Sequence, residues 1–151
     1  MYKRQAQAAV GAIGEDVFIA ARFNAWPAIL WLNEEAKPGE RVFYIGEHRG
    51  WGARRFQPLW SDWFDTPLVL TELRRTGSPG KLLADWRAQG IRFVLLNQAE
   101  LGLYEAAYFA PRFTPAEYEQ FRSLREALLK RVVWEQVPGI FICRLDGDED
   151  P

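Results

Sequence analysis

Two short apolar runs of the chain end in polar residues that could bind a ligand. The segment 46–51 places an acid, an imidazole, a guanidinium and an indole directly after the apolar run 41–46, and an amide ends the run 91–97. If the fold brings these two ends together, the groups suit a sugar or a phosphate group. The alternative is that they only tie down the irregular loop that follows. The candidate ligand-binding residues are Glu47, His48, Arg49, Trp51 and Asn97.

These residues match no catalytic motif. The segment 46–52 (GEHRGWG) has neither the G-x-G-x-x-G spacing nor the G-K-[ST] ending of a phosphate-binding loop. His48 is the only histidine and Cys143 the only cysteine, which excludes an intrachain disulfide and any site built from several histidines or several cysteines. A serine triad would have to use His48, and no G-x-S-x-G elbow is present. We therefore expect no catalytic residue, no metal and no cofactor.

Seven tryptophans are many for a chain of 151 residues. Trp26, Trp86 and Trp134 occupy positions typical of a core. Three others fall in the irregular loop 47–64, where they suit a stacking platform for sugar, a face toward a membrane headgroup layer, a contact with another domain, or a small core under the loop. Of these three, Trp60 and Trp63 are the candidates for the membrane or domain contact, and Trp51 is a candidate for ligand binding.

The composition is that of a folded domain without an electrostatic preference for nucleic acid. Apolar residues make up 48% of the chain and charged residues 26%. The 19 basic and 20 acidic residues nearly balance, giving a net charge of −1, so we expect no nucleic-acid partner. No apolar run reaches the 18 residues that a membrane span requires, so this segment itself is expected to be soluble.

Strands and helices alternate along the sequence in the order of an α/β fold. Thr66, Ser78 and Thr114 each precede a proline in the pattern that opens a helix, and Asn24 is a candidate cap for an earlier one. A helical crossover between two apolar strands favours a parallel pair, and Val137-Pro138-Gly139 predicts a closing hairpin. We predict a three-layer α/β/α sandwich with a small, mostly parallel sheet and a C-terminal antiparallel hairpin. The predicted strands are 41–46, 56–60, 91–97, 131–136 and 140–145, and the predicted helices 24–36, 66–75, 78–90, 98–107 and 114–130.

The residues at the two ends of the chain are interpreted as lying outside the predicted domain. The codons for Met1–Gln5 match the end of a transposon adapter used in sequencing libraries, so we interpret these five residues as adapter read-through; a natural basic start is the alternative. Residues 6–23 are interpreted as the lead-in from a missing N-terminal region. Residues 24–145 are expected to form a single α/β domain, followed by an acidic tail at 146–151.

A series of short motifs runs through the predicted domain in a fixed order. They are W-L-N-E-x-x-x-P-G-x-R-V (31–42), Y-I-G-E-x-R-G (44–50), F-D-T-P-L (64–68), G-I-R-F-V-L-L-N (90–97), F-T-P-x-E (113–117) and V-P-G-I-F-I-C-R-L (137–145). The series resembles the soluble C-terminal domain of bacterial multi-spanning glycosyltransferases of the dolichyl-phosphate-mannose-protein mannosyltransferase type. The resemblance covers about residues 24 to 145.

The resemblance implies a role outside catalysis. Enzymes of this family transfer a sugar from a polyprenyl-phosphate carrier on the outer face of the cytoplasmic membrane, and their catalytic acid lies in the membrane body, which these residues do not include. The chain would then be an extracytoplasmic domain that covers the site, positions a sugar acceptor, or contacts the missing membrane domain or lipid headgroups. Two other interpretations stay open: a binding module of another membrane or secreted protein, and a free-standing soluble α/β enzyme acting at Glu47–Arg49 and Asn97.

Overall fold

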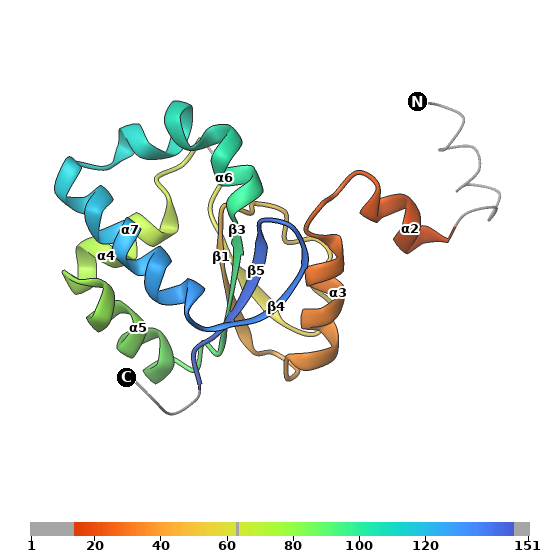
Figure 1. Ribbon diagram of the computed structural model, residues 1–151. Coiled ribbons are helices and arrows are strands. Elements are labelled where there is room, and N and C mark those ends of the chain that lie inside the picture. The colour runs from red at the N-terminus through yellow and green to blue at the C-terminus, as the bar shows by residue number, and fades with distance from the viewer. Residues whose placement is uncertain (1–13, 63, 147–151) are drawn as a thin grey trace.

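The computed structural model describes residues 14–62 and 64–146, which are built around one five-stranded sheet (Figure 1). The strand order is β2-β1-β3-β5-β4. β1 pairs in parallel with both β2 and β3, while β5 pairs antiparallel with β3 and with β4. The strands are β1 (Arg41–Ile45), β2 (Gln57–Leu59), β3 (Phe93–Asn97), β4 (Val132–Val137) and β5 (Ile140–Arg144). The predicted parallel pair and the predicted C-terminal hairpin are both confirmed.

Helices cover both faces of the sheet, as the predicted three-layer architecture requires (Figure 1). One face packs on α3, and the other on α4, α5 and α7. The helices are α2 (Glu15–Ala20), α3 (Trp26–Glu35), α4 (Leu68–Thr76), α5 (Pro79–Ala88), α6 (Gln98–Tyr104) and α7 (Pro115–Leu129). Between α6 and α7 lie a π-helical turn, η1 (Glu105–Phe109), and a 3₁₀ turn, η2 (Ala110–Arg112).

Side chains of the central strands alternate between the two cores, which fixes the register of the sheet. Along β1, Val42 and Tyr44 point to the α3 side, whereas Phe43 and Ile45 point to the α4 side. Every residue of β3 is buried. Trp26, Trp86 and Trp134 are all buried, so their predicted place in the core is confirmed.

The helix starts were predicted correctly at two positions and wrongly at two others. Ser78 accepts a hydrogen bond from the amide of Lys81, and Thr114 forms a complete capping box with Glu117. Asn24 does not cap α3, because the N-cap position falls on Ala25. Thr66 does not cap α4 either: the N-cap falls on Pro67, one residue later than predicted, and the helix begins at Leu68. The Leu68 amide instead donates to Oγ of Ser61, at 3.0 Å.

The described end of the lead-in segment packs against the domain. Phe23 lies in the α3-side core, and the indole of Trp26 donates to Asp16 of α2 at 3.2 Å. The predicted adapter residues 1–5 and residues 6–13 lie outside the described residues, as do residues 147–151 of the tail. Within the described ranges, the search for a helix long and apolar enough to cross a membrane finds none.

Both outer strands of the sheet are short or irregular. β2 has three residues, and its central residue, Pro58, has no backbone N–H to donate. β4 is interrupted by shifts of register between Val132 and Trp134 and again between Trp134 and Val137. The regular ladder therefore lies in the three inner strands, which carry the candidate site at their ends.

Candidate functional site

The candidate site lies where the chain leaves β1 and β3. The connection after β1, residues 46–56, runs to the α3 side, where the side-chain amide of Asn33 donates to the carbonyl of Gly52 at 2.9 Å. The segment after β3 leads through α6 to Phe109, which belongs to the core on the other side. The two connections leave toward opposite faces, and the position between such strand ends, here called the crevice, is where open α/β sheets bind ligands. The prediction that the two loops lie side by side is confirmed.

Glu47 stands at the centre of this crevice, and its carboxylate is engaged by its neighbours. Its side chain has no exposed area. Oε1 accepts hydrogen bonds from the backbone amides of His48 and Arg49 and from Nε of Arg49, at 3.0, 2.9 and 2.7 Å. Oε2 accepts from Arg49 and from the side-chain amide of Asn97, both at 3.0 Å. Glu47 is therefore a structural anion that joins the ends of β1 and β3, with no lone pair left over for a proton-transfer role.

Arg49 pairs with two carboxylates at once. Besides Glu47, its guanidinium binds Glu100 of α6 at 2.7 Å. Burial lowers the pKa of Arg49, but the hydrogen bonds and charges of Glu47 and Glu100 outweigh that effect and raise the pKa above its ordinary value. The same guanidinium lies 4.3 Å from the ring centroid of Phe23. Arg49 thus ties the loop, α6 and the lead-in segment together.

Glycine is required where the loop begins. Gly46 has a φ of +73°, and a Cβ at this position would lie 2.5 Å from the carbonyl oxygen of Asn97 and 2.5 Å from Cγ of Leu101. Gly52 has ordinary backbone angles, but a Cβ there would overlap the indole of Trp26. These two close approaches let the loop turn tightly over the strand ends and hold Glu47 against Asn97.

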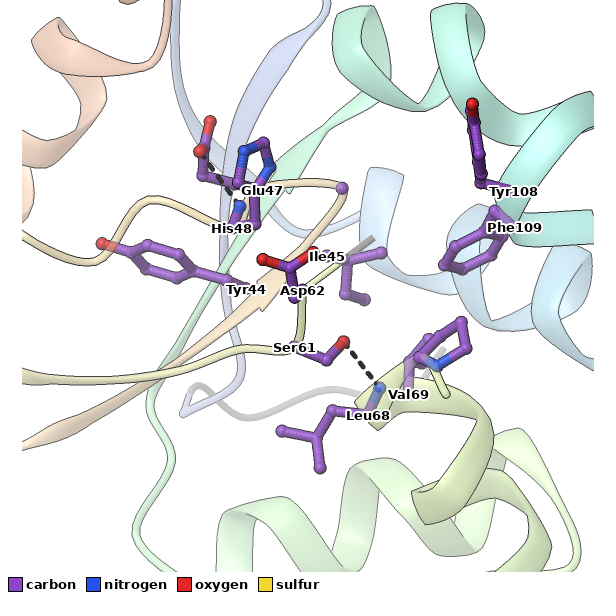
Figure 2. A pocket seen from close by; sticks show the side chains of 12 residues that line it. Tyr44, Ile45, Glu47, His48, Ser61, Asp62, Leu68, Val69, Tyr108 and Phe109 are labelled. Atoms are coloured by element: carbon purple, nitrogen blue, oxygen red, sulfur yellow. Dashed lines mark hydrogen bonds between the residues drawn. The ribbon is translucent and has the colours of Figure 1, made fainter. Parts of the chain in front are cut away.

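A pocket of about 380 Å³, partly open to solvent, lies beside Glu47 on the α4 side of the sheet (Figure 2). Its lining comes from the segments 44–48, 61–62, 67–69 and 108–109. In Figure 2, Glu47 and His48 stand on one side, Tyr108 and Phe109 on the other, and Asp62 between them. Glu47 and His48 are therefore the two predicted site residues that line the pocket, and the rest of its lining comes from residues that were not predicted as site residues.

Two polar side chains enter this pocket from the segment after β2. Asp62 is half-buried, and its Oδ1 accepts a hydrogen bond from the amide of Phe64 at 3.1 Å. Ser61 accepts the amide of Leu68 through Oγ, which holds the start of α4 against the pocket. The signal for them was present: like Glu47, they follow a parallel strand, and residues after parallel strands gather at the binding edge. The irregular segment 47–64 hid this, because β2 is only three residues long.

Tyr44, beside Glu47 at the end of β1, does not supply an acid or base. Its ring points away from Tyr108 and Phe109 in Figure 2 and packs on Phe56, with ring centroids 6.3 Å apart. Burial, and then the nearby charge of Glu47, raise the pKa of the Tyr44 phenol above its ordinary value, so the phenol stays protonated at neutral pH.

The two described tryptophans of the loop, Trp51 and Trp60, are exposed, and they lie at the same edge of the sheet as the crevice. Trp51 stacks on Trp26 with ring centroids 5.3 Å apart, yet 61% of its surface is exposed. Trp60 is 42% exposed. Trp63 lies outside the described residues. The other large apolar side chains exposed on the loop and on the α6–η1 segment at this edge are Phe64, Leu103, Tyr104 and Tyr108; together with Trp51 and Trp60 we call them the aromatic edge.

Comparison with known proteins finds no matching family model, no matching curated protein and no matching solved structure. The described residues contain no cluster of His, Cys, Asp and Glu that suits a metal ion. The functional argument therefore rests on the contacts of the crevice, the pocket and the aromatic edge.

Proposed function

We propose that the chain is a non-catalytic docking domain, the extracytoplasmic C-terminal domain of a membrane glycosyltransferase that takes its sugar from a polyprenyl-phosphate carrier. One observation carries the proposal. At the carboxyl edge of the sheet, the charged residues of the crevice bind one another while large apolar side chains face outward. An active site needs the opposite arrangement, with reactive groups open to the substrate.

The carboxylate and the guanidinium at the centre of the crevice are both engaged by other residues of the chain. Glu47 is buried and fully hydrogen-bonded, and Arg49 is shared between Glu47 and Glu100. The hydrogen bonds of Glu47 join the ends of two strands, so its carboxylate has a structural use in the fold. This is why we favour a docking role over the interpretation as a free-standing enzyme.

The aromatic edge supplies the docking surface. Phe64 and Leu103 are 78% and 73% exposed, and Trp51 and Trp60 add indoles. Within it, Tyr108 contacts both Phe64 and Tyr104, and neighbouring exposed apolar side chains mark an interaction surface. Tryptophan and tyrosine are enriched where proteins meet the headgroup layer of a membrane. We assign this edge to the membrane body of the same protein and to the lipid headgroups around it.

The first test is the sequence of the gene upstream of the codon for Ala6. The proposal expects several apolar segments of about 20 residues there, with an acidic residue in the first outward loop. A reading frame that truly starts at Met1, with its own ribosome-binding signal, contradicts the proposal.

The second test measures docking directly. The chain is sedimented with vesicles of phosphatidylethanolamine and phosphatidylglycerol, and we expect it to bind them. Replacing two exposed residues, Phe64→Ser and Leu103→Ser, removes apolar contacts and should weaken binding about tenfold or more. The matched control is Val133→Ser, since Val133 is also exposed but lies on the outer strand β4. Equal binding by the double variant and the control refutes the role of the aromatic edge.

A further inference from the structure

We propose that the pocket beside Glu47 binds one neutral sugar unit, held by Asp62 and Tyr108. The inference deepens the proposed function, on which it rests, because it gives the domain a place to hold the acceptor of the transferred sugar. It assigns the ligand to Asp62 and Tyr108, which take no part in the hydrogen bonds of Glu47 with Arg49 and Asn97. The domain itself would catalyse no reaction.

The two walls of the pocket differ in a way that suits a sugar ring. One wall is apolar and is formed by Ile45, Val69 and Phe109. The other is polar and carries Ser61 and Asp62. A pyranose ring has the same asymmetry, since its C–H groups form an apolar face and its hydroxyl groups project from the edge.

The charges around the pocket select a neutral ligand over an anion. The described residues that line it include two carboxylates and the imidazole of His48, and neither lysine nor arginine. Arg49 already pairs with Glu47, whereas Asp62 uses only Oδ1 in a hydrogen bond to the described residues. A phosphate would meet this carboxylate with no lysine or arginine in the lining to offset it. A sugar hydroxyl can instead donate to it, and hydrogen bonds to a charged acceptor are the stronger ones.

The backbone that presents Tyr108 is unusual, which supports a role in binding. Tyr108 lies in the π-helical turn η1, and such turns occur frequently at functional sites. Glu105 anchors the turn, because it accepts hydrogen bonds from the Tyr118 hydroxyl at 2.6 Å and from Arg125 at 3.2 Å. The ring of Tyr108 meets Phe64 edge-on, with centroids 6.1 Å apart, and 44% of the residue remains exposed. An aromatic ring held at a pocket rim can stack on the C–H face of a sugar.

The test is an NMR titration of the ¹⁵N-labelled chain with the methyl glycosides of mannose, glucose and galactose. Inorganic phosphate and methylammonium are titrated in parallel as the anionic and cationic alternatives. We expect at least one glycoside to give saturable shifts of the amides at 61–62 and 108–109, and neither ion to do so. Asp62→Asn removes a charged acceptor and should raise the dissociation constant about tenfold. Tyr108→Ala should weaken binding as well, and Asp65→Asn, an exposed acid nearby that does not line the pocket, should leave it unchanged.

Each other outcome overturns the proposal. It fails if no glycoside gives saturable shifts, if phosphate or methylammonium binds in its place, or if binding survives both Asp62→Asn and Tyr108→Ala. Asp62 also shapes its own loop through the bond to Phe64, so Tyr108→Ala keeps the test decisive if the first variant folds poorly. No lipid or membrane protein is used. If the chain binds a sugar but its gene encodes no membrane spans, the proposed function is refuted and this inference is not. If the gene encodes membrane spans but the chain binds no sugar, this inference is refuted and the proposed function is not.

Discussion

The side-chain amide of Asn97 donates a 3.0 Å hydrogen bond to the carboxylate of Glu47, and both residues are buried. This bond connects the end of β3 to the end of β1, two strands whose connections leave the sheet toward opposite faces. The strand ends are consequently closed by internal contacts, and the neighbouring pocket is left as the open part of the edge.

Removing the Glu47 carboxylate should destabilise the fold. Glu47→Ala leaves Arg49 and the Asn97 amide without their acceptor, and breaking a buried charge pair in this way costs about 3 kcal/mol of unfolding free energy. The control is Glu119→Ala, which breaks an exposed pair with Arg122 and should change stability by about 0.5 kcal/mol or less. Urea unfolding of the two variants measures the difference. Similar values for both would mean that the Glu47 network does not hold the strands together.

Gly46 and Gly77 allow a matched test of the loop that begins the site. Both have positive φ, but a Cβ at Gly77 meets open space, whereas one at Gly46 meets Asn97 and Leu101. Gly77→Ala should therefore lower the unfolding free energy by only about 1 kcal/mol, from backbone strain. Gly46→Ala adds roughly 1–3 kcal/mol of overpacking to that strain. Thermal unfolding checks the order, and a Gly46→Ala variant as stable as Gly77→Ala would contradict the close approach.

The single thiol should be inert while the chain is folded. Cys143 is buried in β5, and desolvation raises its pKa to about 12, so the reactive thiolate is scarce at neutral pH. We expect no reaction with an aromatic disulfide reagent in native buffer and reaction of one thiol per chain in denaturant. Rapid modification of the native chain would show that β5 opens more readily than its place beside β3 implies.

Acid should weaken the start of α7 in a defined range of pH. The hydrogen bond from Arg74, followed by that from the Thr114 backbone, lowers the pKa of Glu117 from 4.5 to about 2. The stabilisation is complete above the unfolded-state value of 4.5 and is lost as the pH falls toward 2. The stability gap between the wild type and Glu117→Gln should therefore be widest above pH 4.5 and should close near pH 2. A gap for Glu117→Gln that persists at pH 2 would refute the assignment.

Local sequence signals predicted the elements whose stability is local. The apolar runs at 41–46 and 91–97 and the Pro138-Gly139 turn specified the parallel pair and the hairpin. The capping box at Thr114 also depends only on residues within one turn of the helix. Ser61 could not be predicted as the partner of Leu68, because that contact spans seven residues and exists only once β2 has joined the sheet.

The site was predictable in part for the same reason. Residues that follow two recognisable strands, Glu47 and Asn97, were correctly expected at one edge. Tyr108 was not singled out, because the π-helical turn that presents it follows no simple spacing and depends on contacts of Glu105 with α7. The hydrogen bonds between the side chains of Glu47 and Arg49 also depend on three-dimensional geometry, which residue types alone do not reveal.

The outer strands have a consequence for how copies of the chain can associate. A three-residue strand centred on Pro58 and a strand whose register shifts twice offer no long, regular row of free N–H and C=O groups to a further strand. Association between copies at high concentration should therefore occur through side chains of the aromatic edge and not through backbone pairing. Such clusters should dissolve on dilution or in mild detergent, and they should not convert into cross-β fibrils.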